Sequence, residues 1–263
     1  MALNRQKRDS PRRSGAGIGT LVRLGVEEEY RTRLPDGREL TLMRRGTELR
    51  TTVSAPPPDG TPGEEDITIL ESDTAPTIRP VLPDLPLVLQ PESEFRIMPG
   101  AVIRTAIALP LGIGLTDGDE EPPRLIREYP AVALSKTWFG TPDSGEAAYS
   151  WKTSLSSRPL PEETAPWEAA CPLVVRNDSP EILDFKRMIL RVPGLSLYSD
   201  GRATVTDAVT VRYRGQTQVS QVSVGSRSGG PPGGFRMLTG PRTPVDKALL
   251  RRSFAFIKTI YTG

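Results

Sequence analysis

Residues 131–155 read AVALSKTWFGTPDSGEAAYSWKTSL, and this stretch decides the fold class of the chain. Two runs rich in aromatic and β-branched residues flank the segment GTPDSG at 140–145. Gly, Pro, Asp and Ser are the residues that dominate tight turns. Trp138 lies before this turn, and Tyr149 and Trp151 lie after it. The pattern predicts a β-hairpin, and its aromatic content indicates that this hairpin anchors the core of an all-β domain.

Further hairpin signals occur on both sides of this stretch. Asp-Gly pairs at 36–37 and 200–201 each separate two runs in which polar and apolar residues alternate. Asp-Gly is a favoured two-residue hairpin turn. Only 37% of the residues are hydrophobic, while 27 are Pro and 24 are Gly, which is typical of short strands and many turns. The sequence therefore predicts an all-β fold, a β-sandwich built from antiparallel hairpins.

Residues 244–263 are the exception, because they carry the signals of one amphipathic α-helix. Thr243 can cap this helix, Pro244 suits its first position, and Asp246 completes a capping box. Apolar side chains repeat on one face and basic side chains lie opposite. Two roles stay open: the helix packs on the β body, or it docks on a protein partner or an anionic membrane surface. The docking role assigns contacts to Lys247, Arg251, Phe254, Ile257 and Lys258.

Changes in composition divide the chain into five segments. We expect a disordered basic tail at 1–16, a β meander that can form its own subdomain at 17–83, the main β-sandwich at 84–224, a flexible Gly/Pro linker at 225–243, and the helix at 244–263. The two ends are basic, with charges of +4 over residues 1–15 and +5 over residues 235–263, and the body between them carries −7. Since the body is acidic and only 6% of residues are aromatic, we do not expect nucleic-acid binding.

Two scarce residue types exclude several classes of chemistry. The chain has no histidine, which excludes Ser-His-Asp and Cys-His catalysis and histidine metal sites. Its single cysteine, Cys171, excludes an intramolecular disulfide, and its apolar neighbours predict a small buried side chain. We expect no cofactor. No apolar run reaches the ~18 residues that span a bilayer, and no signal peptide is recognisable, so we expect a cytoplasmic protein without a transmembrane span.

Four stretches carry a resemblance to a known family: IRTAIALPLGIG at 103–114, LSKTWFGTPDSG at 134–145, LVVRNDS at 173–179 and LYSDG at 197–201. Together they resemble an uncharacterised prokaryotic family, domain of unknown function 432, over residues 85–211. The family has no established activity. The resemblance therefore implies a fold neighbourhood and marks residues 140–142 as a candidate functional loop.

Two functions from different classes remain open. The first is a binding or accessory module that acts through its loops or its basic C-terminal helix. The alternative is a carboxylate-dependent carbohydrate-active enzyme or carbohydrate-binding protein, with Lys136 and Lys152 flanking its acidic groups. The candidate loop residues are Gly140, Thr141, Pro142, Asp143 and Glu146, and the candidate aromatic contacts are Trp138, Tyr149 and Trp151. We prefer the binding module, and a pocket that holds Asp143 or Glu146 beside a second carboxylate would favour the enzyme.

Overall fold

The structure is a computed structural model, and it describes residues 12–14, 19–54, 65–71, 75–117, 124–140, 142–143, 145–215, 221–225 and 233–243. Apart from one 3-10 turn, η1 (Val192–Gly194), every regular element in these ranges is a β-strand. The all-β prediction is confirmed. None of the described segments forms a helix long and apolar enough to cross a membrane. The predicted C-terminal helix at 244–263 lies outside the described residues.

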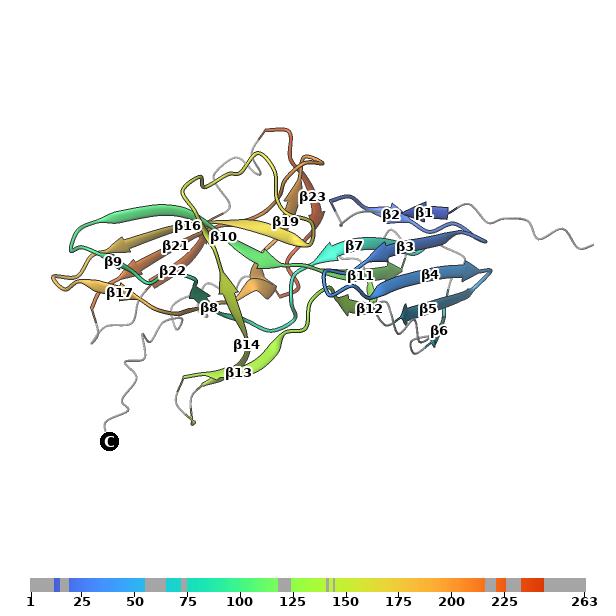
Figure 1. Ribbon diagram of the computed structural model, residues 1–263, viewed down its shortest axis with the longest axis horizontal. Helices are drawn as coiled ribbons and strands as arrows, with labels where there is room; N and C mark the ends of the chain where they lie inside the picture. The colour runs from blue at the N-terminus through green and yellow to red at the C-terminus, as the bar shows by residue number, and fades with distance from the viewer. Residues whose placement is uncertain are drawn as a thin grey trace, which may run out of the picture.

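The first of two lobes consists of two sheets (Figure 1). One has the strand order β1 (Arg12–Ser14), β3 (Glu29–Arg33), β4 (Glu39–Arg45), β5 (Glu48–Ser54) and β6 (Glu65–Ile69). The other has the order β12 (Arg124–Pro130), β11 (Gly112–Asp117), β7 (Thr77–Val81) and β2 (Val22–Arg23). Alternate side chains of β4 point inward, as the period of a half-buried strand requires. They meet Ile78, Ile113 and Leu115 from the other sheet in one apolar core.

The second lobe contains the larger core. Its widest sheet has the order β15 (Leu155–Ser156), β10 (Val102–Pro110), β16 (Glu168–Asn177), β20 (Thr204–Thr206), β19 (Leu197–Ser199) and β23 (Arg236–Thr239), and β16 also pairs with β21 (Ala208–Tyr213), which pairs with β22 (Gln221–Gly225). A second sheet has the order β13 (Ser135–Phe139), β14 (Glu146–Thr153), β8 (Leu87–Pro91) and β18 (Met188–Leu190). A short pair is formed by β9 (Phe95–Ile97) and β17 (Leu183–Phe185).

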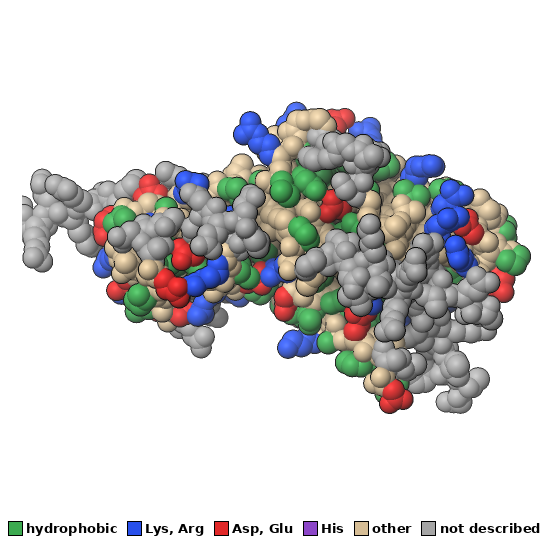
Figure 2. Space-filling model, turned by 180° about the vertical axis from the view of Figure 1, so that it is seen from behind, with side chains coloured by type: hydrophobic (Ala, Val, Ile, Leu, Met, Phe, Trp, Pro, Cys, Tyr) green, Lys and Arg blue, Asp and Glu red, His purple; other side chains and the backbone are tan. Residues whose placement is uncertain are grey.

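The chain ties the lobes together at several points. β10 of the second lobe leads through Leu111 into β11 of the first, so one extended run serves both (Figure 1). Trp167 precedes β16 of the second lobe, yet its side chain is buried in the core of the first. β23 adds a third connection, because Thr239 Oγ1 donates a hydrogen bond of 2.6 Å to the carbonyl oxygen of Pro80. On the face seen in Figure 2, acidic and basic side chains are interspersed over both lobes.

The hairpins predicted from local turn signals are present. β3 and β4 pair across Gly37, which has a φ of 86°, and β19 and β20 pair across Gly201, which has a φ of 91°. Glycine adopts such positive φ values without the steric cost that other residues meet. Cys171 is fully buried as expected, and burial raises the pKa of its thiol to about 12.

The role predicted for the central hairpin is confirmed only in part, because Phe139 and Ala148 belong to the core of the second lobe but other side chains of the hairpin do not. β13 and β14 do form it, but β13 is the edge strand of its sheet, and Trp138 is 51% exposed. Most of this core comes from other strands, among them β8, β18, β10, β16 and β21. Aromatic content signals a strand, but it does not say how central the strand is, because edge position depends on pairing with distant segments.

Three boundaries also differ from those expected. β1 lies in the segment expected to be a disordered tail, where Arg12 to Ser14 pair in parallel with β3. A backbone ladder at a sheet edge requires no apolar side chains, so composition does not reveal it. β23 lies inside the expected linker, where Gly and Pro on either side mask a four-residue strand. β11 and β12, expected in the central sandwich, belong to a sheet of the first lobe.

Candidate functional site

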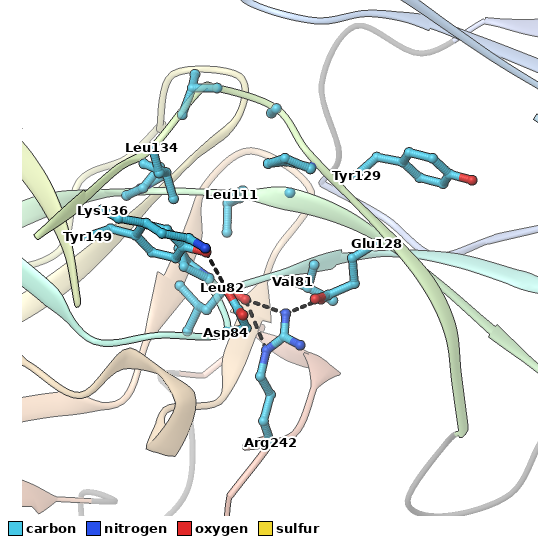
Figure 3. A pocket seen from close by; sticks show the side chains of 16 residues that line it. Val81, Leu82, Asp84, Leu111, Glu128, Tyr129, Leu134, Lys136, Tyr149 and Arg242 are labelled. Atoms are coloured by element: carbon cyan, nitrogen blue, oxygen red, sulfur yellow. Dashed lines mark hydrogen bonds and ion pairs between the residues drawn. The ribbon is translucent and has the colours of Figure 1, made fainter. Parts of the chain in front are cut away.

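A cavity of about 290 Å³ lies where the two lobes meet (Figure 3). Five segments that are far apart in the sequence form its wall: the end of β7 with the loop after it, the β10–β11 junction, the end of β12 with the loop after it, the β13–β14 hairpin, and Arg242 beyond β23. The cavity is small for a ligand site, since such sites usually measure about 300–1,000 Å³. It therefore fits a small molecule or one small group of a ligand.

The inner part of the cavity is apolar. Val81, Leu82 and Leu111 line it and are buried in the protein, and Leu134 adds a half-exposed side chain from the loop before β13. The ring of Tyr129, by contrast, points away from the cavity (Figure 3). An apolar surface of this kind favours an apolar ligand group, because binding removes both surfaces from water.

An ion pair closes one side of the cavity. Arg242 pairs with Glu128 of β12, and its Nε donates a hydrogen bond of 3.0 Å to the carbonyl oxygen of Leu82. The two side chains are 22% and 26% exposed. The backbone N–H of Arg242 also donates to the carbonyl oxygen of Pro193 at 2.8 Å. The guanidinium thus contacts Glu128 and the carbonyl oxygen of Leu82, while the backbone of Arg242 bonds to the second lobe, so Arg242 and Glu128 form part of the wall.

The mouth of the cavity holds a tyrosine, a lysine and an aspartate. Lys136 and Tyr149 are cross-strand partners in the β13–β14 ladder, so their side chains lie next to each other (Figure 3). The hydroxyl of Tyr149 donates a hydrogen bond of 3.1 Å to Oδ1 of Asp84. Burial, followed by this bond and the nearby negative charge, raises the pKa of Tyr149. The phenol thus stays protonated at neutral pH and keeps donating to Asp84.

Lys136 and Asp84 both keep their charge available to a ligand. Lys136 forms no ion pair within the described part of the chain, and Asp84 and Lys136 are not bonded to each other. Hydrogen bonding from the neutral phenol of Tyr149 positions Asp84 without cancelling its charge. The mouth therefore presents one cation and one anion beside an apolar interior.

Most of the loop residues proposed from the sequence lie away from this cavity. Asp143 is exposed at the tip of the hairpin next to Pro142, and Thr141 lies outside the described residues. Glu146 forms an ion pair with Arg191. Gly140 has a φ of 117°, which places the loop's start in a conformation that favours glycine. The loop geometry is thus set by turn residues, and its carboxylates do not line the cavity.

The three candidate aromatic residues fall in different environments. Tyr149 lines the cavity, as described above. Trp151 is a structural residue, because its Nε1 donates a hydrogen bond of 2.9 Å to the carbonyl oxygen of Ala108. Trp138 lies across Gly145 at the hairpin end, so closely that a Cβ at position 145 would collide with its indole. The candidate helix residues Lys247, Arg251, Phe254, Ile257 and Lys258 lie outside the described residues.

Sequence reasoning missed Asp84, Glu128 and Arg242. Each stands in an unremarkable stretch, and the three are brought together only by contacts between remote segments. A second, smaller hollow of about 220 Å³ lies over β10 and β16, where burial raises the pKa of Glu168.

The fold and the cavity define a two-lobed all-β protein with a candidate site at the junction of its lobes. Residues 23–258 match the family described as "Protein of unknown function (DUF432)". The chain belongs to this family, and the match extends well beyond the 85–211 recognised from motifs. No curated protein and no solved structure matches the chain significantly.

Proposed function

We propose that this protein is a binding module whose ligand site is the cavity between the lobes. The observation that carries the proposal is the convergence of Lys136, Asp84 and Tyr149 on the mouth of an apolar cavity. Concave apolar sites with a few converging polar groups are the usual form of small-molecule sites. The proposal keeps the binding class expected from the sequence and moves the site from the hairpin loop to the side of the same hairpin.

The geometry supports binding better than carboxylate catalysis. A glycosidase of the usual kind needs one carboxyl group as an acid and a second as a nucleophile or base. In the cavity, Glu128 is held by Arg242, and Asp84 accepts a hydrogen bond from Tyr149. Asp143 and Glu146, the carboxylates predicted from the sequence, do not line it. The acidic groups thus serve to shape and charge the site.

The experiment that tests the proposal is a fragment screen by saturation-transfer NMR on the full chain. The probes are small molecules with an apolar body and one or two polar groups. Leu134→Trp places a bulky side chain in the half-exposed wall, and Leu125→Trp adds the same residue on β12 at a side chain that does not line the cavity. Fragments should bind the unaltered protein and Leu125→Trp, and Leu134→Trp should abolish that binding. If both variants bind equally, or if no fragment binds, the site is not this cavity.

We also infer that the second lobe is a β-sandwich. In support, one apolar cluster joins β8 and β18 of one sheet to β10, β16 and β21 of the other. Such a cluster is what two packed inner faces produce. Methyl–methyl NOEs between residues of β8 and β16 are therefore expected, and their complete absence would contradict this arrangement.

The C-terminal segment remains a second proposed contact, on a protein partner or an anionic membrane surface. Its test is a chain that ends at Thr243, because this chain keeps β23 and Arg242. If the segment docks elsewhere, the shortened chain should keep its thermal stability and lose binding to phosphatidylserine vesicles or its self-association. If the shortened chain instead unfolds or aggregates, the segment packs on the body and the docking role fails.

A further inference from the structure

We propose that the cavity binds a zwitterion of the α-amino-acid class with an apolar side chain, whose carboxylate contacts Lys136 and whose ammonium contacts Asp84. This inference rests on the proposed function, because it names the ligand class of the same site. Three features of the cavity lead to it: its size, its apolar interior, and the charges at its mouth.

The size and lining limit the ligand to one small apolar group with a polar head. The volume of about 290 Å³ has room for one small group inside the cavity. The inner wall offers Leu82, Leu111 and Leu134 to an aliphatic or aromatic group. The polar side chains lie at the mouth, where Asp84 and Lys136 are exposed. A ligand must therefore place its apolar part inward and its head at the mouth.

The charges at the mouth select the head group. Arg242 and Glu128 neutralise each other within the wall, which leaves Lys136 and Asp84 as the charged side chains of the cavity lining that have no ionic partner among the described residues. An anionic head at Lys136 would lie near Asp84 and be repelled by it. A cationic head at Asp84 would be repelled by Lys136. A head that carries both charges on neighbouring atoms satisfies each side chain and meets no like charge.

Tyr149 prepares the anionic half of this site. Its hydroxyl holds Oδ1 of Asp84 at 3.1 Å, which leaves Oδ2 to accept a hydrogen bond from a ligand ammonium. Figure 3 shows the side chains of Lys136 and Tyr149 running alongside each other toward Asp84. Since both start from paired positions of the β13–β14 ladder, the ladder fixes the separation of their Cα atoms. The bond from Tyr149 preorganises Asp84, which lowers the entropic cost of binding.

The experiment is isothermal titration calorimetry on the full chain with three probes of matched shape. L-Leucine carries both charges, 4-methylpentanoate lacks the ammonium, and 3-methylbutylamine lacks the carboxylate. L-Leucine should bind about tenfold or more tightly than either analogue, because each analogue leaves one charged side chain of the site unpaired. Equal binding of L-leucine and one analogue would overturn the zwitterion and assign the site to that single charge.

Variants assign the two charges to their residues. Lys136→Met should remove the advantage of L-leucine over 3-methylbutylamine, and Asp84→Asn should remove its advantage over 4-methylpentanoate. The matched controls are Lys152→Met and Asp143→Asn, which change exposed side chains of the same hairpin outside the cavity and should leave binding unchanged. An unchanged ligand preference in Lys136→Met and Asp84→Asn would overturn the assignment.

The two levels of proposal fail in different ways. If fragments bind and Leu134→Trp abolishes that binding, but L-leucine shows no advantage over its analogues, the cavity remains the site and the ligand class is wrong. If Leu134→Trp leaves all fragment binding unchanged, the proposed function and the ligand class fail together.

Discussion

Removing the guanidinium of Arg242 should destabilise the whole molecule, because this group joins Glu128 of the first lobe to Leu82, whose side chain belongs to the core of the second. In Arg242→Met, the carbonyl oxygen of Leu82 and the carboxylate of Glu128 lose their donor. Hydrogen bonds to charged groups contribute about 1.5–3 kcal/mol. We expect the free energy of unfolding to fall by about 3 kcal/mol, which corresponds to a drop in Tm of roughly 6–12 °C for a chain of this size.

A double-mutant cycle with Glu128→Gln separates the contribution of the Arg242–Glu128 ion pair from that of the other bonds of the guanidinium. Exposed pairs contribute about 0.2–1 kcal/mol, and removing one partner of a buried pair costs about 3–5 kcal/mol. At 22% and 26% exposure this pair lies between the two classes, so we expect a coupling free energy of about 1.5 kcal/mol. The assay is urea unfolding followed by tryptophan fluorescence, with each variant measured at low and high salt.

The matched control is the pair of Arg158 and Glu162, whose side chains are 74% and 87% exposed. Its coupling should be close to zero and should vanish in about 1 M salt, where screening acts within ~3 Å. A coupling at Arg242 that is no larger than that of the control would refute the view that this pair joins the lobes.

Three further predictions concern single side chains. Gly145→Ala should lower the free energy of unfolding by about 1–3 kcal/mol, because the new Cβ would lie 2.8 Å from the carbonyl oxygen of Phe139. In the control Gly240→Ala the new Cβ meets nothing within 4 Å, so the loss in the same urea assay should be far smaller. Asn177→Ala should lower the free energy of unfolding by about 3 kcal/mol, measured by thermal unfolding. The reason is that the fully buried Asn177 donates hydrogen bonds to the carbonyl oxygens of Ile97 at 2.9 Å and Glu181 at 2.7 Å. Cys171 should react with a thiol reagent such as DTNB only after unfolding, and fast labelling of the native protein would contradict this. Folding raises the pKa of the Cys171 thiol from 9.0 to about 12. The stability that the protonated thiol contributes is therefore complete below pH 9 and is lost as the pH rises toward 12.

The fold class could be predicted because its signals are local. Asp-Gly at 36–37 and 200–201 sets the register of β3–β4 and β19–β20 through the turn itself, without help from remote residues. The predictions that differ from the structure concern strands whose pairing partners lie far away in the sequence. Whether β13 is central or at an edge depends on β8, which joins β14 in parallel from some 60 positions earlier in the chain. β23 depends in the same way on β19.

Little of the candidate site could be predicted, for the same physical reason. Tyr149 is predictable because it is one of the aromatic residues that mark the hairpin, and Lys136 because it flanks the loop. Asp84, Glu128 and Arg242 belong to three other segments, and no spacing rule links them. The position of Glu146 in the hairpin loop predicts a site carboxylate, but in the structure Glu146 pairs with Arg191, which lies 45 residues away in the sequence.

The position of the cavity at the lobe junction separates residues that can change from residues that cannot. Lys136 and Asp84 stand at the mouth, exposed and outside both apolar cores, so substituting them should alter binding while leaving the unfolding free energy nearly unchanged. Arg242 and Glu128 stand in the wall and bond across the junction, so substituting them should alter stability first. A junction of this kind lets a binding site gather polar groups from four segments without burying any of them fully in a core. If Lys136→Met unfolds the protein as readily as Arg242→Met does, this division between mouth and wall is wrong.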